Sequence, residues 1–544
     1  MNKPKNLFSR FGTYTLILLW AMVWLIFFQG WYHYHFFFQE QNQLFLNSWS
    51  YLCTYFEKPA WLACLLGDWL TQFYYYLYAG PVILCCALFL TGIVCLKALR
   101  TAGIQRPWLA TSIAMIIMTI EAIFSFHYDH RLPSVLAVTG GATIFWLSTL
   151  LARHINRHSQ WLSAMMIFLS ATLTFWLFGC GIWMYSLLLI TGWLIHIKEA
   201  NSYLHLGILA ITLFFISICK RFYFLPFDAL YSYPGIGKLI MPQLDLEKTF
   251  AADDEYYFGN YSKLTRMVEA DPNPNQYMKY YYNLVMAQQR KLPDRLLAFS
   301  NNYLGTFENI GPDTPTLTIK TLNELYWILG DMTFAERATI LGMVNSPNNR
   351  NIRMTKRLAE INIVNGEWNA ARKFLRILQK TFVWHTWAEQ LLNALDHPEG
   401  EHQGLLKAYQ EKANLTNLTD TIRLSDNSYT IMQELLESNA ENHIALDYLL
   451  CSDLLLKDMD TFKRDYDQYC YRMENPPYQT KLYQEALMIY LAGTHAPQSE
   501  WQKYIHRNDL LERFLQYNEQ RGSDAFTDTY WYYFDKAETP KLSK

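Results

Sequence analysis

The stretch GPVILCCALFLTGIVCLKA, residues 80–98, decides the class of fold because Lys97 is its only charged residue. A helix needs about 20 apolar residues to cross roughly 30 Å of hydrocarbon. Six similar stretches occur before residue 220 and none after it. We therefore predict a bundle of seven membrane-spanning helices, over residues 13–30, 80–98, 107–126, 133–152, 161–179, 182–198 and 203–219.

Charge divides the chain in the same place, although the whole chain averages 51% hydrophobic residues and a net charge of −2. Residues 1–219 hold 11 Lys/Arg and 6 Asp/Glu, a formal charge of +5, and residues 220–544 hold the other 35 and 42, a charge of −7. We predict a bundle over 1–219 with the lipid bilayer as its partner, a linker over 220–244, and a soluble domain over 245–544. Its acidic balance argues against nucleic acid as a partner.

Short loops rich in Lys and Arg usually lie in the cytoplasm. The N-terminus, the 97–106 turn, the 153–160 turn and Lys198 carry such residues and fall on one side if seven spans alternate. The first span has no small-residue cleavage site after it, so we expect it to be retained. The sequence thus predicts a bacterial inner-membrane protein with a cytoplasmic N-terminus and a periplasmic C-terminal domain, although Lys220 and Arg221 oppose this orientation.

The 31–79 loop lies outside the cytoplasm in this topology and is too long for a turn. Apolar residues recur in it at helical spacing, both from Phe45 to Phe56 and after Pro59, which predicts two amphipathic helices on the outer leaflet. Glu40 precedes them. It is either an N-cap or first-turn acid of the next helix, or a catalytic base or metal ligand near the lipid headgroups.

A second outer loop, between the third and fourth spans, reads His127-Tyr128-Asp129-His130-Arg131. Upstream, Glu121 lies inside the third span, where an ionisable group suggests function. Two imidazoles and a carboxylate can bind a divalent cation, with His127 and Asp129 as possible ligands, or move protons. The alternatives are a solvated turn that anchors two helices, or a site for a lipid headgroup or a structural ion pair.

The order of these features resembles the GT-C superfamily of membrane glycosyltransferases: a first span, a long outer loop with an early acid, a short outer loop with a second acid, and a C-terminal extracytoplasmic domain. The resemblance implies transfer of a sugar or similar group from a lipid carrier, with Glu40 and Asp129 in catalysis. Gln41 follows Glu40, so the paired acidic motif of many members is missing. The chain is also similar to uncharacterised polytopic membrane proteins of Gram-negative gut bacteria, which supplies no activity.

From residue 245 onward the sequence predicts an all-α domain of helical pairs. The segment 352–380 resembles a tetratricopeptide unit, through its small, turn-glycine, aromatic and apolar positions Leu358, Ala359, Gly366, Trp368, Ala371, Leu375 and Leu378. The resemblance implies a divergent array with a concave surface that binds proteins or peptides. An irregular helical cap over the bundle is the alternative.

Cysteine usage decides little. Cys53, Cys64, Cys451 and Cys470 face outward in the predicted topology, but they lack metal-type spacing. A Cys53–Cys64 disulfide would require the loop helices to fold back on one another.

Two functions therefore stay open. One is an enzyme of the outer leaflet that acts on a lipid-linked substrate, in which Arg131, aided by His127, His130 and Glu121, binds that substrate. The other is a membrane-anchored scaffold whose helical domain binds an envelope protein or peptide. A transporter is a more distant third. A divalent cation is possible in the first case, and no residue pattern names the reaction.

Overall fold

The computed structural model describes residues 5–154, 160–195, 202–219, 222–223, 225–227, 229–299, 302–305, 311, 313–397, 403–416 and 427–539. Over these ranges the chain forms helices and no strand, as the sequence predicts. Contacts between residues divide it into two compact units. Unit 1 comprises Met1–Phe250 and Lys380–His385, and unit 2 comprises Ala251–Gln379 and Thr386–Lys544.

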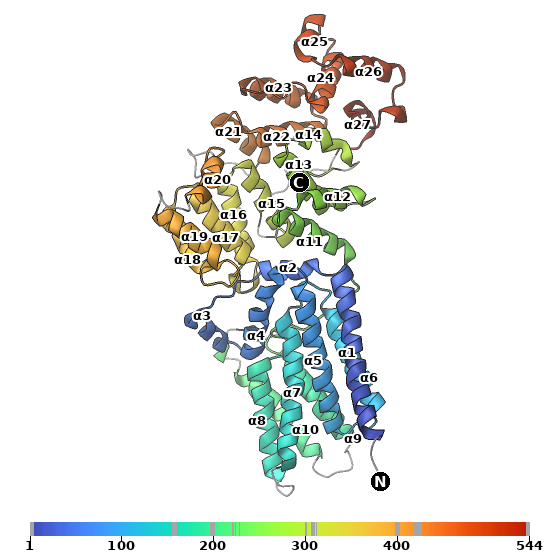
Figure 1. The fold of residues 1–544 in the computed structure, drawn as a ribbon, viewed down its shortest axis with the longest axis vertical. Coiled ribbons are helices and arrows are strands. Elements are labelled where there is room, and N and C mark those ends of the chain that lie inside the picture. The colour runs from blue at the N-terminus through green and yellow to red at the C-terminus, as the bar shows by residue number, and fades with distance from the viewer. Residues whose placement is uncertain are drawn as a thin grey trace. The chain divides into compact units, whose positions relative to one another are not determined.

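Unit 1 contains the apolar part of the chain (Figure 1). Its helices are α1 Lys5–Trp31, α2 Tyr34–Gln41, α3 Trp49–Cys53, α4 Trp61–Thr71, α5 Ala79–Ala102, α6 Pro107–Phe124, α7 Leu132–His154, α8 Gln160–Phe178, α9 Gly181–Ile195 and α10 Ser202–Cys219, with 3-10 turns at Thr54–Glu57 and Gln72–Tyr75. Within the described ranges, five are long and apolar enough to cross a membrane: α1, α5, α6, α7 and α8. The other two predicted spans correspond to the shorter apolar helices α9 and α10.

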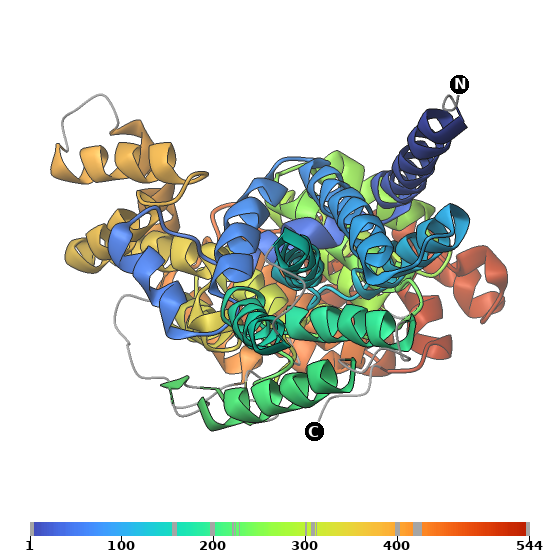
Figure 2. The ribbon, with the colours of Figure 1, turned by 90° about the horizontal axis from the view of Figure 1, so that it is seen from below.

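Helix α7 lies in the middle of unit 1, packed against α4, α5, α8 and α9 (Figure 2). Glycine permits its closest contact. A Cβ on Gly141 of α7 would lie 2.0 Å from the carbonyl oxygen of Gly181 on α9, and one on Gly181 would lie 2.1 Å from the carbonyl oxygen of Ala137. These helices therefore meet backbone to backbone, in the way that small residues allow in membrane bundles.

The 31–79 loop folds into unit 1 and is more elaborate than the two predicted helices. Helix α2 comes first, and most of its side chains are buried. The first two N–H groups of this helix, those of Tyr34 and His35, donate hydrogen bonds to Oε1 of Glu247. A carboxylate at this position also favours the helix dipole. The expected pair follows as α3, which is only five residues long, and α4, which begins two residues after Pro59.

The described part of the predicted linker, from residue 229, packs on the helices of unit 1. The Cys180 N–H donates to the carbonyl of Tyr233 at 2.8 Å, and the Trp183 indole donates to the carbonyl of Tyr231 at 3.0 Å. Gly237 lies so close to the ring of Phe124 that a Cβ there would be 2.0 Å from Cγ. The segment is therefore part of the packed unit, and α11, Leu244–Tyr257, begins only after it.

In the described ranges unit 2 consists of helices around one large apolar core, with a smaller second core at α24, α26 and α27. After α11 these are α12 Tyr261–Ala270, α13 Gln276–Gln288, α14 Leu292–Arg295, α15 Thr316–Leu329, α16 Met332–Val344, α17 Ile352–Val364, α18 Trp368–Leu378, α19 His385–Asp396, α20 Gly404–Ala413, α21 Ser428–Ser438, α22 His443–Leu456, α23 Met459–Tyr469, α24 Lys481–Gly493, α25 Gln498–Tyr504, α26 Asn508–Glu519 and α27 Tyr530–Lys536. Short 3-10 turns lie at Leu296–Ala298, Pro347–Asn349, Cys470–Arg472 and Asp524–Phe526.

Helices α17 and α18 pack together over the segment that resembles a tetratricopeptide unit. Ala359 and Ala371 are fully buried between neighbouring helices, as the predicted close approach requires. Gly366 makes the turn in the left-handed region, with φ of +75°, where glycine has no steric penalty. Trp368 is half exposed rather than part of the core.

Candidate functional site

The outer-loop residues singled out in the sequence form two separate pairs. His127 and Asp129 lie on the surface, with His127 Nδ1 3.6 Å from Asp129 Oδ2 and the Asp129 side chain 70% exposed. No cluster of three or more His, Cys, Asp or Glu side chains suited to a metal ion occurs in the described ranges. The two possible metal ligands are thus adjacent, but they lack a third.

Glu121 and His130 form the second pair, in the interior of unit 1. The Nε2 atom of His130 lies 3.5 Å from Oε2 of Glu121, and both side chains are more than nine-tenths buried. Phe124 packs edge-on against the imidazole. The loop thus turns His130 inward, toward the acid of the third span, while Asp129 next to it points outward.

Arg131 contacts a different acid, Asp68 of α4, at 3.7 Å. The Tyr55 hydroxyl donates to the other oxygen of Asp68 at 3.0 Å. Burial, followed by the charge of Asp68, raises the pKa of Tyr55 above its ordinary value and that of the Cys64 thiol to about 12. Cys53 and Cys64 are both free thiols, so the conceivable bridge between them is absent here.

Glu40 belongs to neither pair. It lies in the last turn of α2, buried, and therefore not in the first turn of the helix that follows. Its charge contributes, after burial, to a raised pKa of Tyr75. The neighbouring Gln39 donates to the carbonyls of Tyr128 and His130, so α2 adjoins the second outer loop. The expected catalytic acids, Glu40 and Asp129, consequently differ in setting: one is buried in α2 and the other is in solvent.

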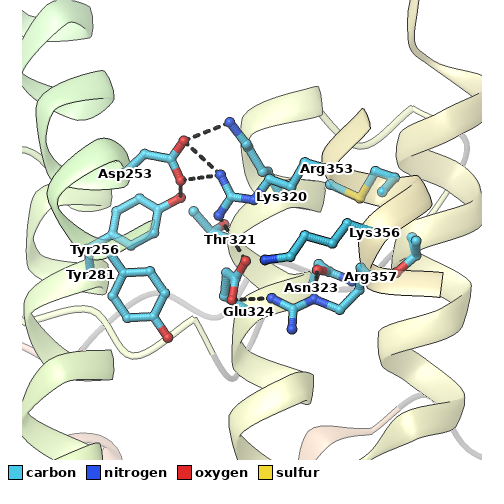
Figure 3. Close-up of polar contacts among 12 residues, drawn as sticks. Asp253, Tyr256, Tyr281, Lys320, Thr321, Asn323, Glu324, Arg353, Lys356 and Arg357 are labelled. Carbon is cyan, nitrogen blue, oxygen red and sulfur yellow. Dashed lines mark hydrogen bonds and ion pairs between the residues drawn. The ribbon is translucent and has the colours of Figure 1, made fainter. Parts of the chain in front are cut away.

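A buried polar cluster lies in unit 2, where α11, α15 and α17 meet (Figure 3). Asp253 accepts hydrogen bonds from Lys320 at 2.6 Å and from Arg353 at 2.8 Å. Glu324 accepts from Arg353 at 2.8 Å and from Arg357 at 2.7 Å. Helical spacing creates this arrangement, because residues four apart share one face of α15 and of α17.

These carboxylates stay ionised because of their partners. Burial alone would raise the pKa of Asp253, but Arg353 and Lys320 hold it well below its ordinary value. Burial acts in the same direction on Glu324, and the charges of Arg357 and Arg353 outweigh it, so that the pKa of Glu324 is also lowered. Charged groups that lose water need such partners, since unpaired buried charges are costly.

A pocket of about 300 Å³ opens beside this network. We call it the basic pocket; it is lined by Tyr256, Tyr257, Tyr261, Gln288, Glu324, Trp327, Ile328, Arg353, Lys356, Arg357, Glu360, Lys412, Leu415 and Ile444. Four cationic side chains thus stand against two carboxylates, which leaves a formal charge of +2. Aromatic rings support the cations: Arg357 lies 4.3 Å above the ring of Trp327.

Of the four cations that line the basic pocket, Lys412 of α20 is the one without an ion pair in the described ranges. Its ammonium group donates to the carbonyl of Trp327 at 2.8 Å and lies 4.9 Å from the Trp327 ring. No carboxylate in the described ranges forms an ion pair with it, whereas Lys356 and Arg357 both pair with Glu360. Burial, and then the charge of Arg357, lowers the pKa of Lys412 to about 8. An anion in the pocket would therefore find a donor that has no other carboxylate partner.

Sequence reasoning missed this pocket, since it concentrated on the ionisable residues of the apolar part. A signal was present. Arg353, Lys356, Arg357 and Glu360 recur at intervals of three or four on α17, and Lys320 and Glu324 do so on α15. Charges at that spacing usually mark a solvated face. Here they alternate with buried apolar residues on helices that are covered on several sides.

Comparison with known proteins identifies the chain as a member of a family of unknown function (DUF6057), which matches residues 9–537. No curated protein and no solved structure matches it. The match extends over both units.

Proposed function

We propose that this protein is a membrane-anchored binding protein whose helical unit 2 holds an acidic peptide in the basic pocket. The observation that supports this proposal is the net positive charge of the pocket, with Lys412 as the cation that forms no ion pair within the described ranges. A buried cation is costly without an opposite charge, and a ligand carboxylate supplies one. Charge-assisted hydrogen bonds of this kind are stronger than neutral ones.

A peptide suits the remaining walls better than a small inorganic anion. Trp327, Tyr257 and Leu415 offer apolar area beside the cations, and specific pockets usually combine a few charged groups with such area. Stacked helical pairs also form extended surfaces on which peptides bind. In this proposal unit 2 is a divergent repeat array, and the pocket receives one acidic side chain of a longer segment.

The five long apolar helices anchor the protein in a membrane. In our proposal α9 and α10 complete seven crossings, so that unit 2 lies outside the cytoplasm of a bacterial cell, as the loop charges predict. The peptide would then belong to an envelope protein. Asp129, which sugar transfer would use in catalysis, is solvent-exposed, so the binding role takes precedence over that reaction in our proposal.

The test uses the full-length protein in phosphatidylcholine nanodiscs and two fluorescein-labelled octapeptides. One alternates Glu with Ala, and the other replaces each Glu by Gln. We expect anisotropy to show binding of the Glu peptide with at least tenfold preference, and Lys412→Met to remove most of that preference, since a hydrogen bond to a charged group contributes about 1.5–3 kcal/mol.

Lys407→Met is the matched control, because Lys407 lies on the same helix with its side chain 77% exposed and outside the pocket. It should bind as the unmodified protein does. Equal affinity for the two peptides, or equal loss in both Lys variants, would contradict the proposal.

A further inference from the structure

A second cavity, of about 430 Å³, lies wholly within unit 1. It is formed by α6, α7, α9 and the segment 235–237, and we call it the α6–α9 cavity. Its walls are mostly apolar, with Ile117 and Ile120 from α6, Val138 from α7, and Met184 and Leu187 from α9. Leu187 is more than half exposed, so the cavity opens at the surface of the unit.

Glu121 and His130 are the carboxylate and the imidazole among the residues that line this cavity. Neither Oε2 of Glu121 nor Nε2 of His130 has a hydrogen-bond partner among the described residues, and the 3.5 Å between them is longer than a good hydrogen bond. Buried polar atoms are normally satisfied. The pair therefore points to a ligand group that reaches both atoms.

The hydrogen-bonding capacity of Glu121 and His130 indicates which ligand group fits between them. A carboxylate oxygen accepts hydrogen bonds, and an imidazole nitrogen that carries its hydrogen donates one. A hydroxyl group donates one hydrogen bond and accepts others, so it matches both atoms. A phosphate would meet the carboxylate of Glu121, and a fixed cation would meet the imidazole, which makes either a poorer match.

The position and the walls of the cavity indicate that the remainder of the ligand is apolar. Helices α6 and α7 are two of those long and apolar enough to cross a membrane, and the cavity lies between them and α9. Its volume falls in the range of ordinary ligand pockets. An apolar chain fits walls of Ile, Val, Met and Leu, and it can enter from the bilayer past Leu187.

We propose that the α6–α9 cavity binds a neutral lipid with an apolar chain and a free hydroxyl group, which donates to Glu121 and accepts from His130. Long-chain alcohols, isoprenoid alcohols and diacylglycerols share this chemistry. The proposal is independent of peptide binding in unit 2, since it depends on different residues of a different unit.

The experiment uses the full-length protein in phosphatidylcholine nanodiscs and a diazirine-bearing hexadecanol as photoaffinity probe. Labelling should map to α6 or α9, and unlabelled hexadecanol should compete at least about fivefold better than hexadecane, as one to two net hydrogen bonds allow. Hexadecyl phosphate should compete more weakly than hexadecanol. Farnesol and a short-chain diacylglycerol are tested as further competitors, and their potency relative to hexadecanol shows which class of hydroxyl-bearing lipid binds best.

Two sets of variants keep the proposal falsifiable. The double variant Glu121→Leu/His130→Leu should lose the preference for alcohol over alkane while still taking up the probe, because only the polar pair is removed. Leu187→Trp, at the mouth, should lower labelling several-fold. Leu194→Trp, on the same helix and equally exposed but outside the cavity, should not. Equal competition by alcohol and alkane in the unmodified protein, stronger competition by the phosphate, or equal effects of the two Trp variants would overturn the proposal.

Discussion

Replacing Glu324 by Gln should destabilise unit 2 more than any exposed charge change. Its carboxylate accepts hydrogen bonds from both Arg353 and Arg357, and its side chain is 4% exposed. The near-isosteric Gln keeps an acceptor oxygen, but it removes the negative charge that lies between two guanidinium groups and compensates both. Breaking a buried ion pair costs about 3–5 kcal/mol. We expect a loss near the lower end of that range, because Asp253 still compensates Arg353.

The assay is equilibrium unfolding of the detergent-solubilised protein in urea, followed by tryptophan fluorescence, since Trp327 lies against Arg357. Glu411→Gln is the control: Glu411 is exposed on α20 and 3.9 Å from Lys407, so its removal should change the unfolding free energy by less than about 0.5 kcal/mol. Adding Arg357→Gln to Glu324→Gln should recover part of the loss, because the charge balance is restored. A Glu324→Gln variant as stable as the control would refute this account of the network.

Three further predictions follow from single groups. Binding of the Glu peptide should weaken as pH rises through the Lys412 pKa of about 8, by about the factor that Lys412→Met removes, because only the ammonium form attracts a carboxylate. A flat profile between pH 7 and 10 in anisotropy titrations would contradict this. Gly141→Ala should lower the unfolding free energy by about 2–3 kcal/mol, because its Cβ would clash with the Gly181 carbonyl. Gly207→Ala, which has open space around it, should not. Equal thermal unfolding of the two variants would contradict this. Burial raises the pKa of Asp447 from 3.8 to about 7, so the stability that its protonated form contributes is present at pH 3 and is lost as pH rises to 7. Asp447→Asn should therefore remove up to about 4 kcal/mol of the pH dependence of the unfolding free energy. An unchanged pH profile in urea titrations would count against this.

The helical class and the apolar half of the chain could be predicted because their signal is local. In the described ranges, five long and two shorter apolar helices coincide with the hydrophobic stretches, and Gly366 makes the turn between α17 and α18. Details that depend on tertiary packing were missed. Helix α2 was not expected, since its N-terminus is stabilised by Glu247, more than 200 residues away. The predicted linker, 220–244, gave no sign in the sequence that its described part packs on unit 1 through backbone groups of Tyr231 and Tyr233.

The candidate sites show the same limit. Sequence identified Glu121 and His130 as suspicious, but not that His130 turns inward while its neighbour Asp129 turns to solvent. The basic pocket required knowledge of which helix faces meet. Lys412 is 88 residues from Glu324 in the sequence, and no local pattern places the two in one pocket.

Photo-crosslinking from the wall of the basic pocket tests the central claim most directly. Tyr257 lines that pocket and Tyr471 lies exposed elsewhere in unit 2, so p-benzoylphenylalanine at either position extends the ring of the native tyrosine by a benzoyl group in a comparable way. In the full-length protein in nanodiscs, the account predicts that the Tyr257 variant captures the Glu octapeptide and that the Gln octapeptide is captured far less. Equal capture from Tyr257 and Tyr471, or equal capture of the two peptides from Tyr257, would contradict it.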